Sequence, residues 1–167
     1  LYWSQLHHIP AVDIVAHRIW WSLPVIWLVI LHRRKRYGGT ATGLFSSRRT
    51  VLWSAGAAVL VTGNWLVYVW AVSKGRVFDA SLGYYINPLV NVALGTLILK
   101  EKLDRMQKIA LAVATAGVLY LTFGLGSFPW VSIVLALSFG TYGLIKKQIS
   151  IGSIDSLALE ITLLAPL

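Results

Sequence analysis

The sequence predicts an all-α polytopic membrane protein, and three observations lead to this fold class. Of the 167 residues, 57% are apolar and only 13% are charged, and the mean hydropathy is +0.70. The charged residues gather in short runs between apolar stretches of about 17 to 22 residues. A helix of that length crosses a hydrocarbon layer of ~30 Å. This composition excludes a soluble enzyme domain.

Each expected span is an apolar stretch between charged or turn-forming residues. Residues 1–9 have the composition of the end of a first span, and Pro10 marks the turn after it. Five complete spans are expected at residues 14–32, 51–72, 80–99, 109–125 and 129–145, and another begins near Ser156. Trp53, Trp70 and Trp130 stand near span ends, where indole rings anchor helices at the interface. The chain starts and stops inside apolar stretches, so we expect a piece of a longer protein.

The basic residues fall almost entirely on one side of the expected bundle. If the spans alternate in direction, the loops of the other side carry only Lys74 and Arg76. Twelve basic residues lie on the first side: Arg33, Arg34, Lys35, Arg36, Arg48, Arg49, Lys100, Lys102, Arg105, Lys108, Lys146 and Lys147. By the positive-inside rule this side is cytoplasmic, and topology accounts for the net charge of +9. No nucleic-acid partner is expected, because phosphate binding needs cations gathered on one water-facing surface.

Motifs of enzymes and metal sites are absent from the sequence. It contains no HExxH, GxSxG, GxGxxG or P-loop motif, and it contains no cysteine. His7 and His8 alone are too few ligands for a metal site. We therefore predict no enzymatic activity, no cofactor and no metal.

Residues 9–24 and 151–166 resemble each other at an offset of 142 positions. Five positions are identical in the two segments: Ile9/Ile151, Asp13/Asp155, Ala16/Ala158, Ile19/Ile161 and Pro24/Pro166. In the expected topology the two copies enter the membrane from opposite faces, so the repeat is inverted. Inverted repeats are typical of secondary transporters that alternate access around a site near the membrane centre.

The span at residues 80–99 carries most of the candidate site. Gly83, Asn87, Asn91 and Gly95 follow one another at four-residue steps and share one helix face. This face either packs closely against another helix or lines a cavity with its two amides. Pro88 removes a backbone donor, which predicts a kink and a freed carbonyl near Tyr84.

Two further groups of polar residues lie inside spans. Asn64 near the centre of its span needs a hydrogen-bond partner, for which Asn87 or Asn91 is the expected candidate, and Trp65 can stack on a flat substrate. Arg18 either extends to the headgroups or faces a watery cavity, and its repeat mate Glu160 has the opposite charge. We expect these two residues as a gate pair, and together with His17 they are also the candidates for coupling transport to protons. His17 is either an interfacial residue or a proton relay.

Three segments carry a resemblance to a known family. The sequences GNWLVYVWAV, ASLGYYINPLVNVALGTLIL and EKLDRMQKIALAVATAGV, with HRIWWS upstream and SFGTYGLIKK downstream, closely resemble the EamA-like family of the drug/metabolite transporter superfamily. The resemblance implies ten helices in two inverted five-helix repeats, with both termini cytoplasmic and an export role. This chain is then part of the ten-helix bundle, with residues 1–125 as the first repeat and 126–167 as the start of the second.

The same resemblance assigns several single positions. Arg18 matches the basic position of the second helix, Pro88 the proline of the fourth and Glu101 the acid that closes it. Gln107 matches the polar residue that opens the fifth helix, and Gly117 its small packing residue. The chain departs from the family at Lys100 and Ala110, where glycine is frequent.

These observations favour a transporter. The expected function is an inner-membrane permease of the drug/metabolite type that exports a small metabolite or drug by alternating access. The expected partners are a small-molecule substrate and the lipid bilayer, and a homodimer is a further option. The expected location is the bacterial inner membrane. The alternatives are a non-transporting membrane protein, such as an assembly factor or sensor, and an intramembrane enzyme with catalytic residues outside this chain. The expected cavity residues are Asn64, Trp65, Tyr84, Asn87 and Asn91.

Overall fold

A computed structural model describes residues 9–37, 47–124, 126, 128–149 and 151–166. Every regular element within them is an α-helix, which confirms the all-α membrane bundle. The six helices are α1 (Ala11–Tyr37), α2 (Arg48–Ser73), α3 (Val77–Leu97), α4 (Arg105–Gly124), α5 (Trp130–Gln148) and α6 (Ser153–Leu164). The span expected to end at residue 9 lies almost wholly outside the described residues.

The helix bounds differ from the expected spans mainly at charged ends. α1 continues through His32 to Tyr37, and α2 and α4 begin at Arg48 and Arg105. These flanking residues are polar but good helix formers, so the helix extends beyond its apolar stretch. At the start of α4, Asp104 Oδ1 accepts a hydrogen bond from the Gln107 N–H, and Gln107 Oε1 accepts one from the Asp104 N–H. This reciprocal pair is a capping box and explains why a polar residue opens this helix.

Three helices are long and apolar enough to cross a membrane, by length and composition. They are Ala11–Arg33 within α1, Arg48–Ser73 and Arg105–Gly124. α3 and α5 are outside this set; α3 contains Asn87, Pro88 and Asn91, and α5 ends in Lys146 and Lys147. These two helices pack on each other. α3 continues without a break through Pro88.

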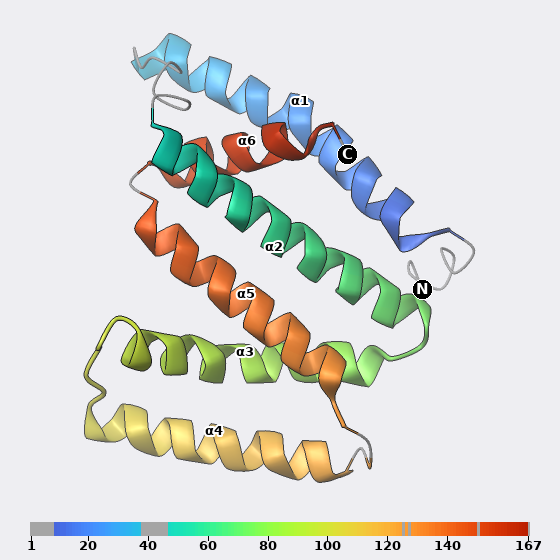
Figure 1. Ribbon diagram of the computed structural model, residues 1–167, viewed down its shortest axis with the longest axis vertical. Helices are drawn as coiled ribbons and strands as arrows, with labels where there is room; N and C mark the ends of the chain where they lie inside the picture. Colours follow the sequence, from blue (N-terminus) through green and yellow to red (C-terminus); the bar gives the residue numbers. More distant parts are fainter. Residues whose placement is uncertain (1–8, 38–46, 125, 127, 150, 167) are drawn as a thin grey trace.

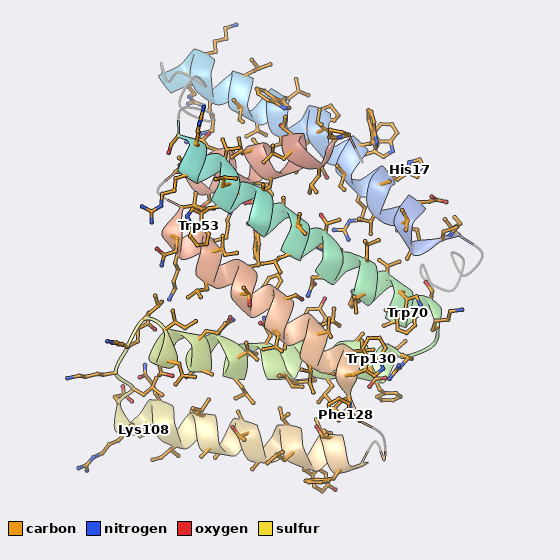
Figure 2. The ribbon with its side chains drawn as sticks, in the orientation of Figure 1. His17, Trp53, Trp70, Lys108, Phe128 and Trp130 are labelled. Atoms are coloured by element: carbon orange, nitrogen blue, oxygen red, sulfur yellow. The ribbon has the colours of Figure 1, made fainter. Side chains whose placement is uncertain are left out.

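Consecutive helices alternate in direction, so their ends meet at two opposite edges of the bundle (Figure 1). Lys108 and Trp53 lie at one edge, and Trp70, Phe128 and Trp130 lie at the other (Figure 2). The Trp70 and Trp130 ring centroids are 5.5 Å apart. The tryptophans therefore mark both ends of the bundle, as expected of interfacial anchors.

α5 packs on both α2 and α3. The residues buried at this junction are Ala71, Val72, Ala80, Val131 and Leu135. α4 packs only along α3 and has no buried residue among those described. The site described below is therefore framed by α2, α3 and α5.

α1 and α6 form a second packed group, and each lies against α2 (Figure 1). Their core consists of Ile26 and Ile30 of α1 with Ala158 and Leu159 of α6. These helices contain the two similar segments, 9–24 and 151–166, and they run in opposite directions in Figure 1. Their antiparallel packing fits the expected inverted repeat; the division of the chain into two repeats at residue 125 stays a prediction.

Glycines set the close approach of α3 and α5. A methyl group added at Gly140 would lie 2.7 Å from Val90 Cγ1, and one added at Gly83 would lie 3.2 Å from Leu135 Cβ. Gly95 instead makes room for the carboxylate of Glu101, whose Oε2 would lie 2.7 Å from such a methyl group. Gly117, expected to pack, has open space around it among the described residues.

Candidate functional site

α2, α3 and α5 enclose a cavity of about 140 Å³. α2 and α3 contribute polar and aromatic side chains, whereas α5 closes the cavity with apolar ones. The lining residues are Asn64, Trp65, Tyr68, Ala80, Gly83, Tyr84, Asn87, Leu135 and Phe139. We call this cavity the aromatic pocket.

The aromatic pocket brings together four of the five residues expected in a cavity, namely Asn64, Trp65, Tyr84 and Asn87. The fifth, Asn91, lies elsewhere. Its Oδ1 would be 3.3 Å from a methyl group at Gly140, and it borders a groove between α3 and α4 that also contains Glu101, Gln107 and Ala110. Asn87 and Asn91 therefore have different surroundings although they belong to one expected face.

Asn64 ties α2 to α5. Its Nδ2 donates hydrogen bonds to the Leu135 carbonyl oxygen and to Ser138 Oγ, both at 2.8 Å. The expectation that Asn87 or Asn91 of the next helix would be its partner is wrong, because α5 lies between α2 and the polar part of α3. The structure thereby fixes the amide of Asn64 at the wall of the pocket.

The amide oxygen of Asn87 is buried and has no hydrogen-bond partner among the described residues. An unsatisfied buried acceptor costs free energy, typically about 1 to 3 kcal/mol, unless water or a ligand supplies a donor. Asn87 lines the aromatic pocket. The pocket therefore contains an acceptor that a bound molecule can satisfy.

Aromatic rings form one side of the pocket. Trp65 and Tyr68 meet edge to face with centroids 5.6 Å apart, and Tyr68 and Tyr84 do the same at 6.0 Å. The guanidinium of Arg18 lies 3.5 Å from the centroid of Trp65, a cation–π contact. Arg18 of α1 thus reaches the ring that lines the pocket from α2.

A larger groove runs between α1 and α6. It has a volume of about 930 Å³, and His17, Arg18, Trp21 and Ile161 are among its lining residues. His17 is exposed and lies near the start of α1 (Figure 2). Arg18 therefore borders this groove as well as contacting Trp65, whereas His17 takes no part in the aromatic pocket.

Glu160 is the centre of a second polar cluster, between α5 and α6. Its side chain is 2% exposed, and its Oε1 accepts hydrogen bonds from Lys146 Nζ at 2.7 Å and from Ser156 Oγ at 2.9 Å. Tyr142 OH donates to Glu160 Oε2 at 3.3 Å, and Lys146 Nζ also donates to Ser156 Oγ at 2.6 Å. We call these four residues the charge cluster.

The expected gate pair of Arg18 and Glu160 is not formed in this structure, since Glu160 pairs with Lys146 and Arg18 stacks on Trp65. Lys146 was not predicted as the partner of Glu160, because the lysines beside the loops were all attributed to topology. A signal was present: Tyr142 and Lys146 are four residues apart, as are Ser156 and Glu160, so each pair shares a helix face.

One departure from the family pattern, Lys100 where glycine is frequent, lies in the turn that follows α3. Lys100 has a φ of 55°, in the left-handed region that glycine adopts without strain. The Glu101 N–H donates to the Gly95 carbonyl oxygen at 3.1 Å, and its carboxylate pairs with Lys147 at 3.1 Å. Glu101 is thus held just beyond the end of α3, and its role as the family's closing acid stays a prediction. The left-handed backbone at Lys100 fits the glycine that is frequent at this position in the family.

Comparisons with known proteins agree with this architecture. The EamA-like transporter family matches residues 3–123. The chain is 45% identical over its whole length to the uncharacterized transporter YojE of Bacillus subtilis, 46% identical over 98% of its length to protein RarD of Streptomyces exfoliatus, and 37% identical over 99% to protein RarD of Escherichia coli. It covers 56%, 51% and 55% of these proteins, so it spans about half the length of the curated relatives it matches. No solved structure matches the chain.

Proposed function

This chain belongs to the EamA-like transporter family, and from that premise we propose that the full-length protein exports a small metabolite or drug by alternating access. The membership supports a transporter of the drug/metabolite type rather than an enzyme. The relatives are about twice as long, so export, alternating access and the identity of the substrate site are our proposals for the whole protein.

The observation that carries the proposal is the unsatisfied acceptor in the aromatic pocket. Asn87 Oδ1 is buried without a partner among the described residues, beside the rings of Tyr84 and Trp65. Within an apolar bundle, such a group is costly and is typical of a substrate pathway. A cavity of about 150 Å³ is large enough for a benzene ring, so the pocket of about 140 Å³ fits one ring-sized part of a substrate.

The placement of the pocket also supports alternating access. Its walls come from α2 and α3, in the expected first repeat, and from α5, at the expected start of the second. Movement of one repeat against the other would change the contacts of α5 with α2 and α3 and would open or close the pocket. We propose that the pocket lies near the membrane centre and is exposed to each side in turn.

The orientation of the protein in the membrane follows from its charges. The basic helix ends, including Arg33, Arg48, Lys108 and Lys147, belong to one edge of the alternating bundle. Translocating these residues would be costly, so we propose that this edge is cytoplasmic. The relatives named above are bacterial proteins, which supports our proposal that this membrane is the bacterial inner (cell) membrane.

The test is transport by the full-length protein. Inside-out vesicles that contain the protein should take up at least one compound of a panel of labelled metabolites and drugs faster than vesicles without it, because the cytoplasmic face is then outside. The uptake is measured with and without an imposed proton gradient. If transport is coupled to protons, the two conditions should give different amounts of uptake. Equal uptake of every compound by both kinds of vesicle would contradict the proposed function and favour a non-transporting role.

A further inference from the structure

The charge cluster joins α5 and α6, two helices that both pack on α2 but otherwise touch each other little. α5 packs on α2 and α3, whereas α6 packs on α1 and α2. Among the described residues, α5 and α6 approach each other only slightly through their backbones. The contacts of Lys146 and Tyr142 with Glu160 and Ser156 therefore connect the two helices across this seam.

A buried ion pair is poorly explained by stability alone. Removing two charges from water costs several kcal/mol per ion, and apolar residues of similar size often stabilise a protein as well or better. Glu160 is nonetheless almost fully buried, and both of its carboxylate oxygens are engaged. Ionisable residues within membrane spans are typical of ion and proton pathways. The cluster is thus a candidate for a coupling site.

We propose that Glu160 is the proton-binding site through which transport is coupled to the proton gradient, with Lys146 as its counter-charge. This inference rests on the proposed transport function. When Glu160 is ionised, it holds Lys146 and fastens α6 to α5, as in this structure. When its carboxylate takes up one proton, Lys146 keeps its own proton and the charge of the cluster changes from zero to +1.

The unpaired ammonium then favours separation of the two helices. A buried cation without a counter-charge is costly, and Lys146 can leave the seam because it stands two residues before the end of α5 with its side chain 23% exposed. Its long apolar stem allows the ammonium to reach water at the basic edge. Protonation of Glu160 is thereby linked to release of the α1–α6 group from the α3–α5 group.

The surroundings of Glu160 leave few other groups to respond to pH. Lys146 and Tyr142 of α5 are the ionisable side chains within hydrogen-bond or ion-pair distance of it in the described part of the chain. Ser156 is its neighbour on α6 itself, and α1 presents the apolar Ile26 and Ile30 to α6. Of an ammonium, a phenol and a carboxylate, the carboxylate is the group that ordinarily binds a proton as a solution becomes acidic.

A spin-label distance tests this link without any substrate. Labels at Leu97→Cys on α3 and Leu157→Cys on α6, both exposed in this structure, are placed in the full-length protein with other cysteines replaced. We expect the distance distribution to shift between about pH 8 and about pH 3.5, where glutamate side chains are ordinarily protonated. Glu160→Gln should give the acidic distribution at both pH values. Glu101→Gln, which breaks the exposed pair with Lys147 one residue along α5, is the matched control and should respond like the unmodified protein.

A pH response that persists in Glu160→Gln, or no response in the unmodified protein, would overturn the proposal. If Glu160→Gln does not fold, the double variant Lys146→Met/Glu160→Leu removes both charges and should show one distribution at both pH values; a remaining pH shift would again overturn it. In vesicles, Glu160→Gln should retain downhill flux of a transported compound but lose gradient-driven accumulation. Failure to find any transported compound would contradict the proposed function alone, because the distance measurement needs no substrate.

Discussion

The aromatic pocket and the charge cluster lie on the same helix, α5, yet they are built in opposite ways. In the charge cluster each charged atom has a partner, and Glu160 is 2% exposed. In the pocket Asn87 Oδ1 lacks a partner among the described residues, and the nearby Arg18 contacts a ring rather than a carboxylate. The comparison teaches that the charge cluster satisfies its own charged groups, whereas the aromatic pocket keeps a hydrogen-bond acceptor that a ligand can satisfy.

The largest expected effect is in the charge cluster. Lys146→Met leaves Glu160 buried without its counter-charge, so we expect the free energy of unfolding of the full-length protein to fall by about 3 to 5 kcal/mol. The double variant Lys146→Met/Glu160→Leu should recover most of this loss. Reversible unfolding in detergent measures both. Equal losses in the single and double variants would show that the cluster is not a charge-paired unit.

A smaller effect is expected where shape rather than charge holds the pocket wall. Gly140→Ala places a methyl group 2.7 Å from Val90 Cγ1 between α3 and α5, and overpacking of this kind costs about 1 to 3 kcal/mol. Gly117→Ala on α4 meets open space and should be neutral or stabilise by up to about 1 kcal/mol through helix propensity. Thermal unfolding of the two variants under the same conditions measures this difference in stability. A Gly140→Ala protein as stable as Gly117→Ala would contradict the close approach of α3 and α5.

The smallest expected loss of stability concerns Arg18, the cation beside the aromatic pocket. Arg18→Met removes a cation–π contact that is exposed on one side, so the stability loss should stay below about 1 kcal/mol, far less than for Lys146→Met. The same unfolding assay compares the two. A loss for Arg18→Met as large as for Lys146→Met would mean that Arg18 has a buried anionic partner in the full-length protein, and the contrast between the two regions would disappear.

Much of this fold could be predicted from apolar runs and charged flanks. The spans at 51–72 and 109–125 lie within or close to α2 and α4, because long apolar stretches have one stable form in a membrane. Four pocket residues were also predictable, since amides and rings near the middle of a span are costly without a purpose. The expected repeat boundary and the roles of the site residues stay predictions.

The contacts between helices could not be predicted, because the spacing of residues along one helix does not say which helices pack together. Gly83 and Gly95 are twelve residues apart, which at about 100° per residue rotates one relative to the other by about 120°. Gly83 therefore faces α5 while Gly95 faces Glu101. Asn91 is rotated from Asn87 by only about 40° but lies about 6 Å farther along the helix axis, and it borders a different cavity. The partner of Asn64 is on α5, 71 residues farther along the chain. Lys146 belongs to the charge cluster because the fold brings Glu160 of α6 within ion-pair distance of it.

The most direct test of the account compares the two neighbouring amides of α3. In the full-length protein, Asn87→Leu removes the unsatisfied acceptor from the aromatic pocket, whereas Asn91→Leu changes an amide at the α3–α5 contact outside it. The measurement is the apparent affinity for a transported compound in vesicles with equal amounts of folded protein. We predict about tenfold weaker affinity for Asn87→Leu, equivalent to about 1.4 kcal/mol, and little change for Asn91→Leu. Unchanged affinity in Asn87→Leu, or equal losses in both variants, would contradict the assignment of the aromatic pocket as the substrate site.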